Sequence, residues 1–166
     1  MSLFGPLWLS AQLALVTTLI LLALGAPLAW WLARTQTRLK PVIQAIVAMP
    51  IVLPPTVLGF YLLILLSPQG AIGSWWVSLT GSALTFSFTG LVIASCIYSL
   101  PFAVQPMQNA FEALPRQTLE RAWTLGASRL DAFFSIAVPL SARGFISGAV
   151  LAFAHTLGEF GVVLMV

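Results

Sequence analysis

Long apolar stretches alternate with short basic segments along the chain, and this pattern predicts membrane-spanning helices. No charged side chain occurs from Met1 to Ala33 or from Pro41 to Phe111. A helix that spans a bilayer needs about 20 apolar residues. The predicted spans are Trp8–Leu32, Val42–Leu66, Leu84–Val104 and Gly144–Val166. The expected fold is therefore an all-α integral membrane protein, a multispan helical bundle with about four spans.

The basic residues predict how these spans are oriented. They form a group at 34–40 and a second group at 116–143, made up of Arg34, Arg38, Lys40, Arg116, Arg121, Arg129 and Arg143. The positive-inside rule places 34–40 and 106–143 in the cytoplasm. The start of the chain and the 67–83 loop carry no Lys or Arg and are expected outside. That loop is predicted to be an external turn with an interfacial aromatic segment.

Composition excludes a soluble protein and gives no sign of an enzyme. Hydrophobic residues make up 60% of the chain, charged residues only 7%, and mean hydropathy is +1.02, whereas soluble domains carry about a quarter charged residues. Cys96 is the single cysteine and His155 the single histidine, so we expect no disulfide and no metal site. The sequence contains no phosphate-loop or His-Glu-x-x-His motif, and no serine near His155 in the chain that would indicate a protease triad.

The segment 106–143 is the longest polar part of the chain, and it predicts two short helices separated by a glycine. Pro115 suits the first turn of one helix and Gly126 its C-terminal stop. Ser128 and Asp131 are typical of the start of the next helix. A single apolar face is expected from Leu119, Ala122, Trp123 and Gly126. Such a pair either packs on its own bundle or docks into a groove of a soluble partner.

This segment resembles the EAA loop of ABC-importer permeases. The family pattern is Glu-Ala-Ala, then Gly, then Ile-x-Leu-Pro at the spacing found here, with departures at Arg121 and Val138. In that family the loop is a coupling helix seated in a cleft of the ATP-hydrolysing subunit. The resemblance implies a cytoplasmic coupling loop at 106–139 within a single permease domain at 1–166. The implied ATPase-coupling residues are Glu120, Arg121, Ala122, Gly126, Ile136 and Pro139.

Two further stretches narrow the resemblance to molybdate permeases. Residues 49–60, which contain Leu53-Pro54-Pro55, resemble the second-span signature of that family, and residues 154–161 resemble its Gly-Glu-Phe-Gly segment. Sulfate/thiosulfate permeases share the latter motif. The resemblance implies a MetI-like fold and ATP-driven import of molybdate or tungstate across the bacterial inner membrane. The alternatives are a sulfate/thiosulfate permease and, less favoured, a stand-alone channel or scaffold protein.

The same resemblance implies the partners. They are an ATP-binding subunit at the cytoplasmic loop, an extracytoplasmic substrate-binding protein, a second permease subunit forming a homodimer, and membrane lipid. The chain itself is expected to bind no cofactor and no nucleic acid, because ATP is held by the partner subunit. Related permeases continue through at least one further span, so we expect the family fold to extend beyond Val166.

Candidate pore or gate residues lie in the second and fourth predicted spans. Pro54 and Pro55 interrupt the second span, either as a simple kink or beside a water-lined path. Glu159 is the acidic residue within a predicted span, and a carboxylate repels an oxyanion. We therefore expect Glu159 to have a structural or gating role, accepting hydrogen bonds from His155 or another helix. The alternatives are direct substrate contact or a position near the outer water. Close helix approach is expected at Gly158 and Gly161.

Overall fold

The computed structural model describes residues 4–158, and the regular elements of that range are helices. In chain order they are α1 (Phe4–Arg34), α2 (Lys40–Val52), α3 (Pro55–Leu66), α4 (Ala71–Thr80), α5 (Phe88–Glu112), α6 (Arg116–Thr124), α7 (Arg129–Ala132), the π-helix η1 (Phe133–Ala137), α8 (Val138–Leu140) and α9 (Ala142–Gly158). The predicted all-helical fold is confirmed for the described residues.

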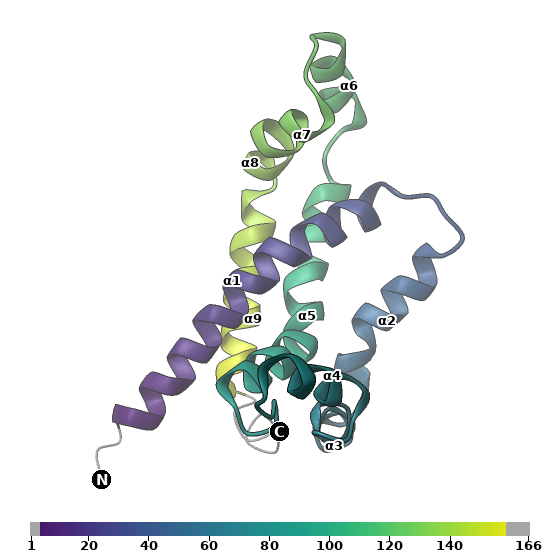
Figure 1. Cartoon of the computed structure of the whole chain (residues 1–166). Helices are drawn as coiled ribbons and strands as arrows, with labels where there is room; N and C mark the ends of the chain where they lie inside the picture. The colour runs from purple at the N-terminus through teal and green to yellow at the C-terminus, as the bar shows by residue number, and fades with distance from the viewer. Residues whose placement is uncertain (1–3, 159–166) are drawn as a thin grey trace.

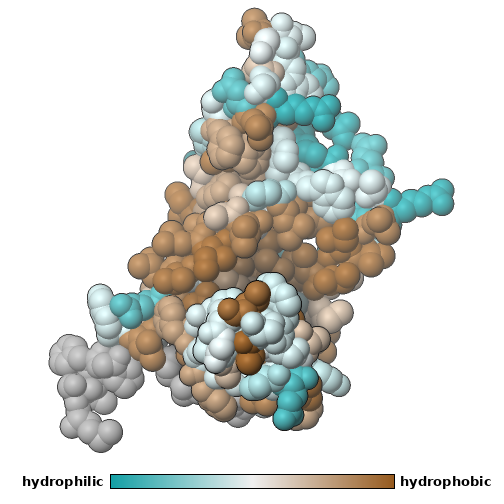
Figure 2. Space-filling view, in the orientation of Figure 1, coloured by the Kyte–Doolittle hydropathy of each residue, from teal (hydrophilic) through white to brown (hydrophobic). Residues whose placement is uncertain are grey.

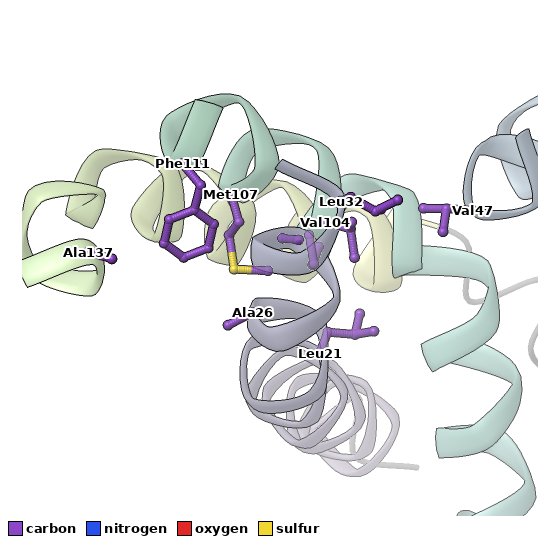
Figure 3. Close-up of a cluster of buried hydrophobic side chains, with 11 residues drawn as sticks. Leu21, Ala26, Leu32, Val47, Val104, Met107, Phe111 and Ala137 are labelled. Carbon is purple, nitrogen blue, oxygen red and sulfur yellow. The ribbon is translucent and has the colours of Figure 1, made fainter. Parts of the chain in front are cut away.

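The centre of the molecule is formed by α1, α5 and α9, which pack against one another along their lengths (Figure 1). Met107 and Phe111 of α5 are fully buried and extend toward α1, where Leu32 is also fully buried (Figure 3). Val47 of α2 and Ala137 of η1 complete the same cluster. The core therefore joins the long helices to η1, which lies between α7 and α8.

Glycines set the distance between α5 and α9. A Cβ on Gly148 would lie 2.9 Å from the carbonyl oxygen of Ala103. A Cβ on Gly144 would collide with the side chain of Ala110 and lie 2.7 Å from the carbonyl oxygen of Pro106. Glycines four residues apart on one helix face allow two membrane helices to approach closely. The backbones of α5 and α9 therefore approach closely at these two glycines.

The second predicted span, Val42–Leu66, is not one straight helix. It is divided into α2 and α3, whose axes differ by 110°. Leu53 and Pro54 both have extended ψ angles, 137° and 136°, and proline has no N–H to continue the hydrogen-bond pattern of α2. The break therefore occurs at the predicted prolines. Its angle of 110° is larger than that of a simple kink within one span.

The external turn predicted at 67–83 contains a helix, α4. Gly70 precedes this helix, and Gly81 ends it with a φ of 71°, a left-handed conformation that glycine adopts without strain. Ile72, Trp75 and Leu79 are exposed on α4, with Trp75 61% exposed. The interfacial aromatic segment is thus present as a helix with an apolar exposed face, which suits the membrane–water boundary.

The third predicted span, Leu84–Val104, starts later and ends later in the structure. The helix α5 starts at Phe88 and continues through Pro101 and Pro106 to Glu112. It therefore includes residues 106–112 of the predicted coupling loop. Lys40 Nζ lies 3.1 Å from Glu112 Oε1, an ion pair that connects the start of α2 with the end of α5.

The arrangement of the helices agrees with the predicted orientation. The α1–α2 connection and α6 to α8 lie toward one end of the molecule, whereas α3, α4 and the first turns of α1 lie toward the other (Figure 1). An apolar band separates polar regions in Figure 2. By length and composition α1 and α5 can each cross a membrane, and the bent pairs α2–α3 and α7–α9 raise the number of candidate spans to as many as four.

Candidate functional site

The predicted glycine stop within residues 106–143 is confirmed. Gly126 has a φ of 91°, and it follows α6 directly after the C-cap residue Leu125. The N–H of Gly126 donates to the carbonyl of Trp123, and the N–H of Ala127 donates to the carbonyl of Ala122, both at 3.0 Å. This pair of bonds is the Schellman motif, whose left-handed position favours glycine. A Cβ at Gly126 would meet nothing within 4 Å, so conformation, not space, requires glycine here.

The predicted helix start after Gly126 is also confirmed. Ser128 is the N-cap of α7, and its hydroxyl accepts a hydrogen bond of 3.1 Å from the N–H of Asp131. The hydroxyl of Ser135 in turn donates to the carboxylate of Asp131 at 2.9 Å. These two hydrogen bonds stabilise the first turn of α7 and the side chain of Asp131. The helix α7 is followed by η1, α8 and α9.

Only part of the predicted apolar face of α6 is buried. Leu119 and Ala122 are 3% and 8% exposed, and they form a cluster with the buried Ala132 of α7. Ile136 and the α1 residue Trp30 pack on this cluster. Trp123 is half-exposed and Gly126 is exposed, so these two do not share the buried face as predicted. Ala122 and Ile136 therefore hold the two short helices on the bundle.

The remaining predicted coupling residues, Glu120, Arg121 and Pro139, are exposed. Large apolar side chains are exposed beside them, and Leu125, at the tip of the turn, is 89% exposed. Leu130 and Phe134 are 71% and 65% exposed. This arrangement presents apolar side chains and charges together on a helix–turn–helix, a surface that fits into a groove of another protein.

Arg34 at the end of α1 fastens the last turn of α5. Its Nη2 donates to the carbonyl of Phe111 at 3.1 Å and to the carbonyl of Leu114 at 3.4 Å. Its guanidinium carbon lies 5.0 Å from the ring centroid of Trp30. The last carbonyls of a helix lack intrahelical partners and carry partial negative charge, so an arginine there is stabilising. The segment before α6 is thus tied to α1.

A cavity of about 560 Å³ lies between the end of α1 and the coupling segment. Three arginines line it: Arg34, Arg116 and Arg129. The predicted coupling residue Glu120 lines the same cavity, and so do the indole rings of Trp30 and Trp123. The sequence placed the arginines in the cytoplasm but gave no indication that they surround one cavity.

Within the membrane part, His155 contacts α5. Ser99 Oγ lies 3.0 Å from His155 Nδ1 and 2.9 Å from Thr156 Oγ1, and Thr156 donates to the carbonyl of Ala152 at 2.9 Å. The Thr156 oxygen is left to accept from Ser99, and Ser99 then accepts from the Nδ1–H of His155. The rings of Tyr98 and Phe102 also stack against the imidazole.

These contacts correct the expectation that no serine lies near His155. Ser99 is distant in sequence but adjacent in space, because α5 and α9 pack side by side. Ser99 is 1% exposed and Thr156 is 2% exposed, so neither hydroxyl is open to a substrate in this conformation. The cluster is a buried hydrogen-bond network between two spans.

Among the described residues, the other predicted gate residues are Pro54, Pro55 and Gly158. Pro54 and Pro55 are exposed at the α2–α3 break. A Cβ on Gly158 would meet nothing within 4 Å among the described residues, and close approach is found at Gly144 and Gly148. Glu159 and Gly161 lie outside the described residues, and their predicted roles stay predictions.

The residues that sequence reasoning missed differ in the signal they leave. Gly144 and Gly148 form a Gly-x-x-x-Gly pattern in an apolar segment, which is a recognisable sign of helix packing. Ser99 and Thr156 leave no such sign, because single hydroxyls are common in membrane helices. Within residues 4–158 no group of His, Cys, Asp and Glu side chains is arranged to hold a metal ion.

Comparison with known proteins agrees with this architecture. Residues 22–166 match the family model described as binding-protein-dependent transport system inner membrane component. The chain is a member of this inner-membrane transport family. It is a multi-pass protein of the inner membrane, in agreement with its apolar helices.

Relatives within this family carry names that refer to molybdenum. The chain is 58% identical to the molybdenum transport system permease protein ModB of Azotobacter vinelandii, over 95% of the chain and 70% of that protein. It is 40% identical to a probable molybdenum ABC transporter permease protein of Haloferax volcanii, over 94% of the chain. It is 37% identical to the molybdate/tungstate transport system permease protein WtpB of Pyrococcus abyssi, over 92% of the chain. The chain spans 56% of the length of each of the last two relatives.

Proposed function

We propose that the chain is the transmembrane permease subunit of an ATP-driven importer of molybdate, with tungstate as a second substrate. The observation that carries the coupling part of this proposal is the helix–glycine–helix segment at the cytoplasmic end. Its inner face, around Ala122, packs on the bundle, and Leu125 and Glu120 are exposed on the same segment. The names of the relatives in Azotobacter vinelandii and Pyrococcus abyssi support the substrate.

The proposed division of work follows from what the chain contains. It has no phosphate-loop motif, so a separate ATP-binding subunit supplies hydrolysis and docks at α6–α7. A binding protein delivers the oxyanion on the opposite side, near α3 and α4. A second copy of the permease completes the translocation path as a homodimer. The chain itself carries out no chemical reaction and holds no cofactor in this scheme.

Coupling is tested by variants at the exposed positions of the segment. Glu120→Lys and Gly126→Trp should insert in the membrane at wild-type levels but lose ATP-dependent uptake, because one reverses a charge on the docking surface and the other distorts the left-handed turn. Thr37→Lys, a charge added at an exposed position of the α1–α2 connection, outside α6 and α7, serves as the control and should leave uptake intact. Normal uptake and normal co-purification of the ATPase by both test variants would refute the coupling role.

Substrate identity is tested by competition. Molybdate uptake should be blocked by excess tungstate and only weakly reduced by sulfate. If sulfate blocks uptake at equimolar concentration, the chain is a sulfate/thiosulfate permease, the principal alternative. Calorimetry on the binding protein encoded beside it should show the same preference. Flux of ions without any ATPase partner would instead favour the stand-alone channel.

A further inference from the structure

The cavity between α1 and the coupling segment has an excess of positive charge. Arg34, Arg116 and Arg129 line it, against the single lining carboxylate of Glu120. The ion pair found among the described residues lies elsewhere, and none of the three arginines takes part in it. Two or more positive charges therefore share this space without a neutralising partner from the described part of the chain.

One of these charges is fixed in place. Arg34 is held by its bonds to the carbonyls of Phe111 and Leu114 and by its position over Trp30. Its Nε is buried and finds no acceptor among the described residues. The charge of Arg116 is close enough to act on Arg34. Like charges held together repel unless an anion lies between them, so the site is organised in a way that favours a bound anion.

The position of the cavity indicates the class of anion. Trp30 belongs to the last turns of α1, and tryptophan and arginine are typical of the membrane–water interface. The polar end above the apolar band of Figure 2 carries the segment that closes the cavity, α6 and α7. Phosphates of acidic lipids lie at this depth, and basic pockets on the cytoplasmic side bind their head groups. The volume, about 560 Å³, is that of a small-molecule site.

We propose that this cavity binds a phosphate-type oxyanion, supplied by the head group of an acidic phospholipid of the cytoplasmic leaflet. Arg34 is the immobilised member of the site, and the exposed Arg116 and Arg129 of α6 and α7 close on the anion from the coupling segment. A bound head group then connects both short helices to the end of α1. The site belongs to the permease itself and does not depend on which oxyanion is transported.

The test uses the permease in nanodiscs of phosphatidylcholine with and without phosphatidylglycerol. Native mass spectrometry measures how many phosphatidylglycerol molecules each variant retains. The test variant is Arg116→Gln with Arg129→Gln, and the matched control is Arg38→Gln with Arg143→Gln, which removes the same charge at exposed positions that do not line the cavity. Wild type and control should retain phosphatidylglycerol selectively. Affinity in the test variant should fall roughly five-fold for each arginine removed.

Two further measurements keep the result decisive. Arg116→Lys with Arg129→Lys keeps the charge and should restore most of the retention, which a folding defect would not do. Inorganic phosphate titrated into phosphatidylcholine nanodiscs, read by Trp123 fluorescence against Trp123→Phe, identifies a soluble source. Phosphate binding that is lost in the test variant, without selectivity for phosphatidylglycerol, supports the oxyanion site but assigns it to a soluble ion. Equal loss of phosphatidylglycerol retention in the test and control variants, or binding of neither ligand, would overturn the proposal. The arginines would then be assigned to contacts with acidic side chains of a partner protein.

Discussion

The hydroxyl of Ser99 on α5 lies 3.0 Å from Nδ1 of His155 on α9, and it is the central member of a buried hydrogen-bond chain that ends at the carbonyl of Ala152. Lipid offers no hydrogen-bond partner to a polar side chain, so such groups pair inside the protein. This pairing fixes the rotation of α9 about its axis relative to α5. The histidine that the sequence marked as a gate candidate is therefore part of a contact between two spans.

The first prediction concerns this contact. Ser99→Ala removes the hydroxyl that joins His155 to Thr156, and hydrogen bonds between membrane helices contribute about 0.6 kcal/mol on average and up to about 1.7 kcal/mol. We expect Ser99→Ala to lower the free energy of unfolding in bicelles by an amount within that range. Ser147→Ala, on the exposed face of α9, is the control. Equal stability of the two variants would show that the hydrogen-bond chain contributes nothing.

The second prediction compares two glycines of α9 with the same substitution. Gly148→Ala places a methyl group 2.9 Å from the carbonyl oxygen of Ala103, and overpacking of this kind typically destabilises by about 1–3 kcal/mol. Gly158→Ala meets nothing within 4 Å among the described residues and should be neutral or slightly stabilising. Thermal unfolding in detergent measures both. A larger loss at Gly158 would mean that the α5–α9 contact is not made at Gly148.

The third prediction concerns the turn between the two short helices. Gly126→Asn should be tolerated, because asparagine adopts left-handed conformations, whereas Gly126→Val should destabilise the segment by about 1–2 kcal/mol. Hydrogen–deuterium exchange of residues 116–132 reports the difference: faster exchange in the valine variant, near wild-type exchange with asparagine. Identical exchange in all three proteins would show that the left-handed turn is not populated.

The fourth prediction tests the orientation. Single cysteines are introduced at Gln36, Gln117 and Ser82, all exposed positions, in a Cys96→Ser background. An impermeant thiol reagent added to intact cells should label the cysteine at Ser82 and leave the other two unlabelled. Labelling appears at all three once the membrane is permeabilised, which controls for reactivity. The reverse pattern in intact cells would overturn the positive-inside orientation.

The sequence predicted best those features that local residues determine. Gly126 and Ser128 identify a helix stop and a helix start within a few residues, and both are found in the structure. Pro54 located the break in the second span. Such signals depend on backbone conformation and on hydrogen bonds between near neighbours. They are therefore visible without knowledge of the remaining fold.

The features that the sequence did not predict depend on tertiary contacts, or on helices that continue past the end of an apolar stretch. The third span was ended at Val104 because polar residues follow it, but α5 continues to Glu112, where its carbonyls meet Arg34 and its carboxylate meets Lys40. The predicted partner of His155, Glu159, lies outside the described residues, and that pairing stays a prediction. The contact of His155 with Ser99 was not predicted, because only the packing of α5 on α9 brings these two residues together.

The hydrogen bonds from Arg34 to the carbonyls of Phe111 and Leu114 connect the end of α1 with the end of α5. Only Pro115 separates Leu114 from α6, so Arg34 holds the chain close to the point where the two short helices begin. We therefore expect a displacement of α6 to be passed to α1 and α5 together, because Arg34 connects these two helices where the chain leaves α5. The close contact of α5 with α9 at Gly148 extends the same coupling to a third helix.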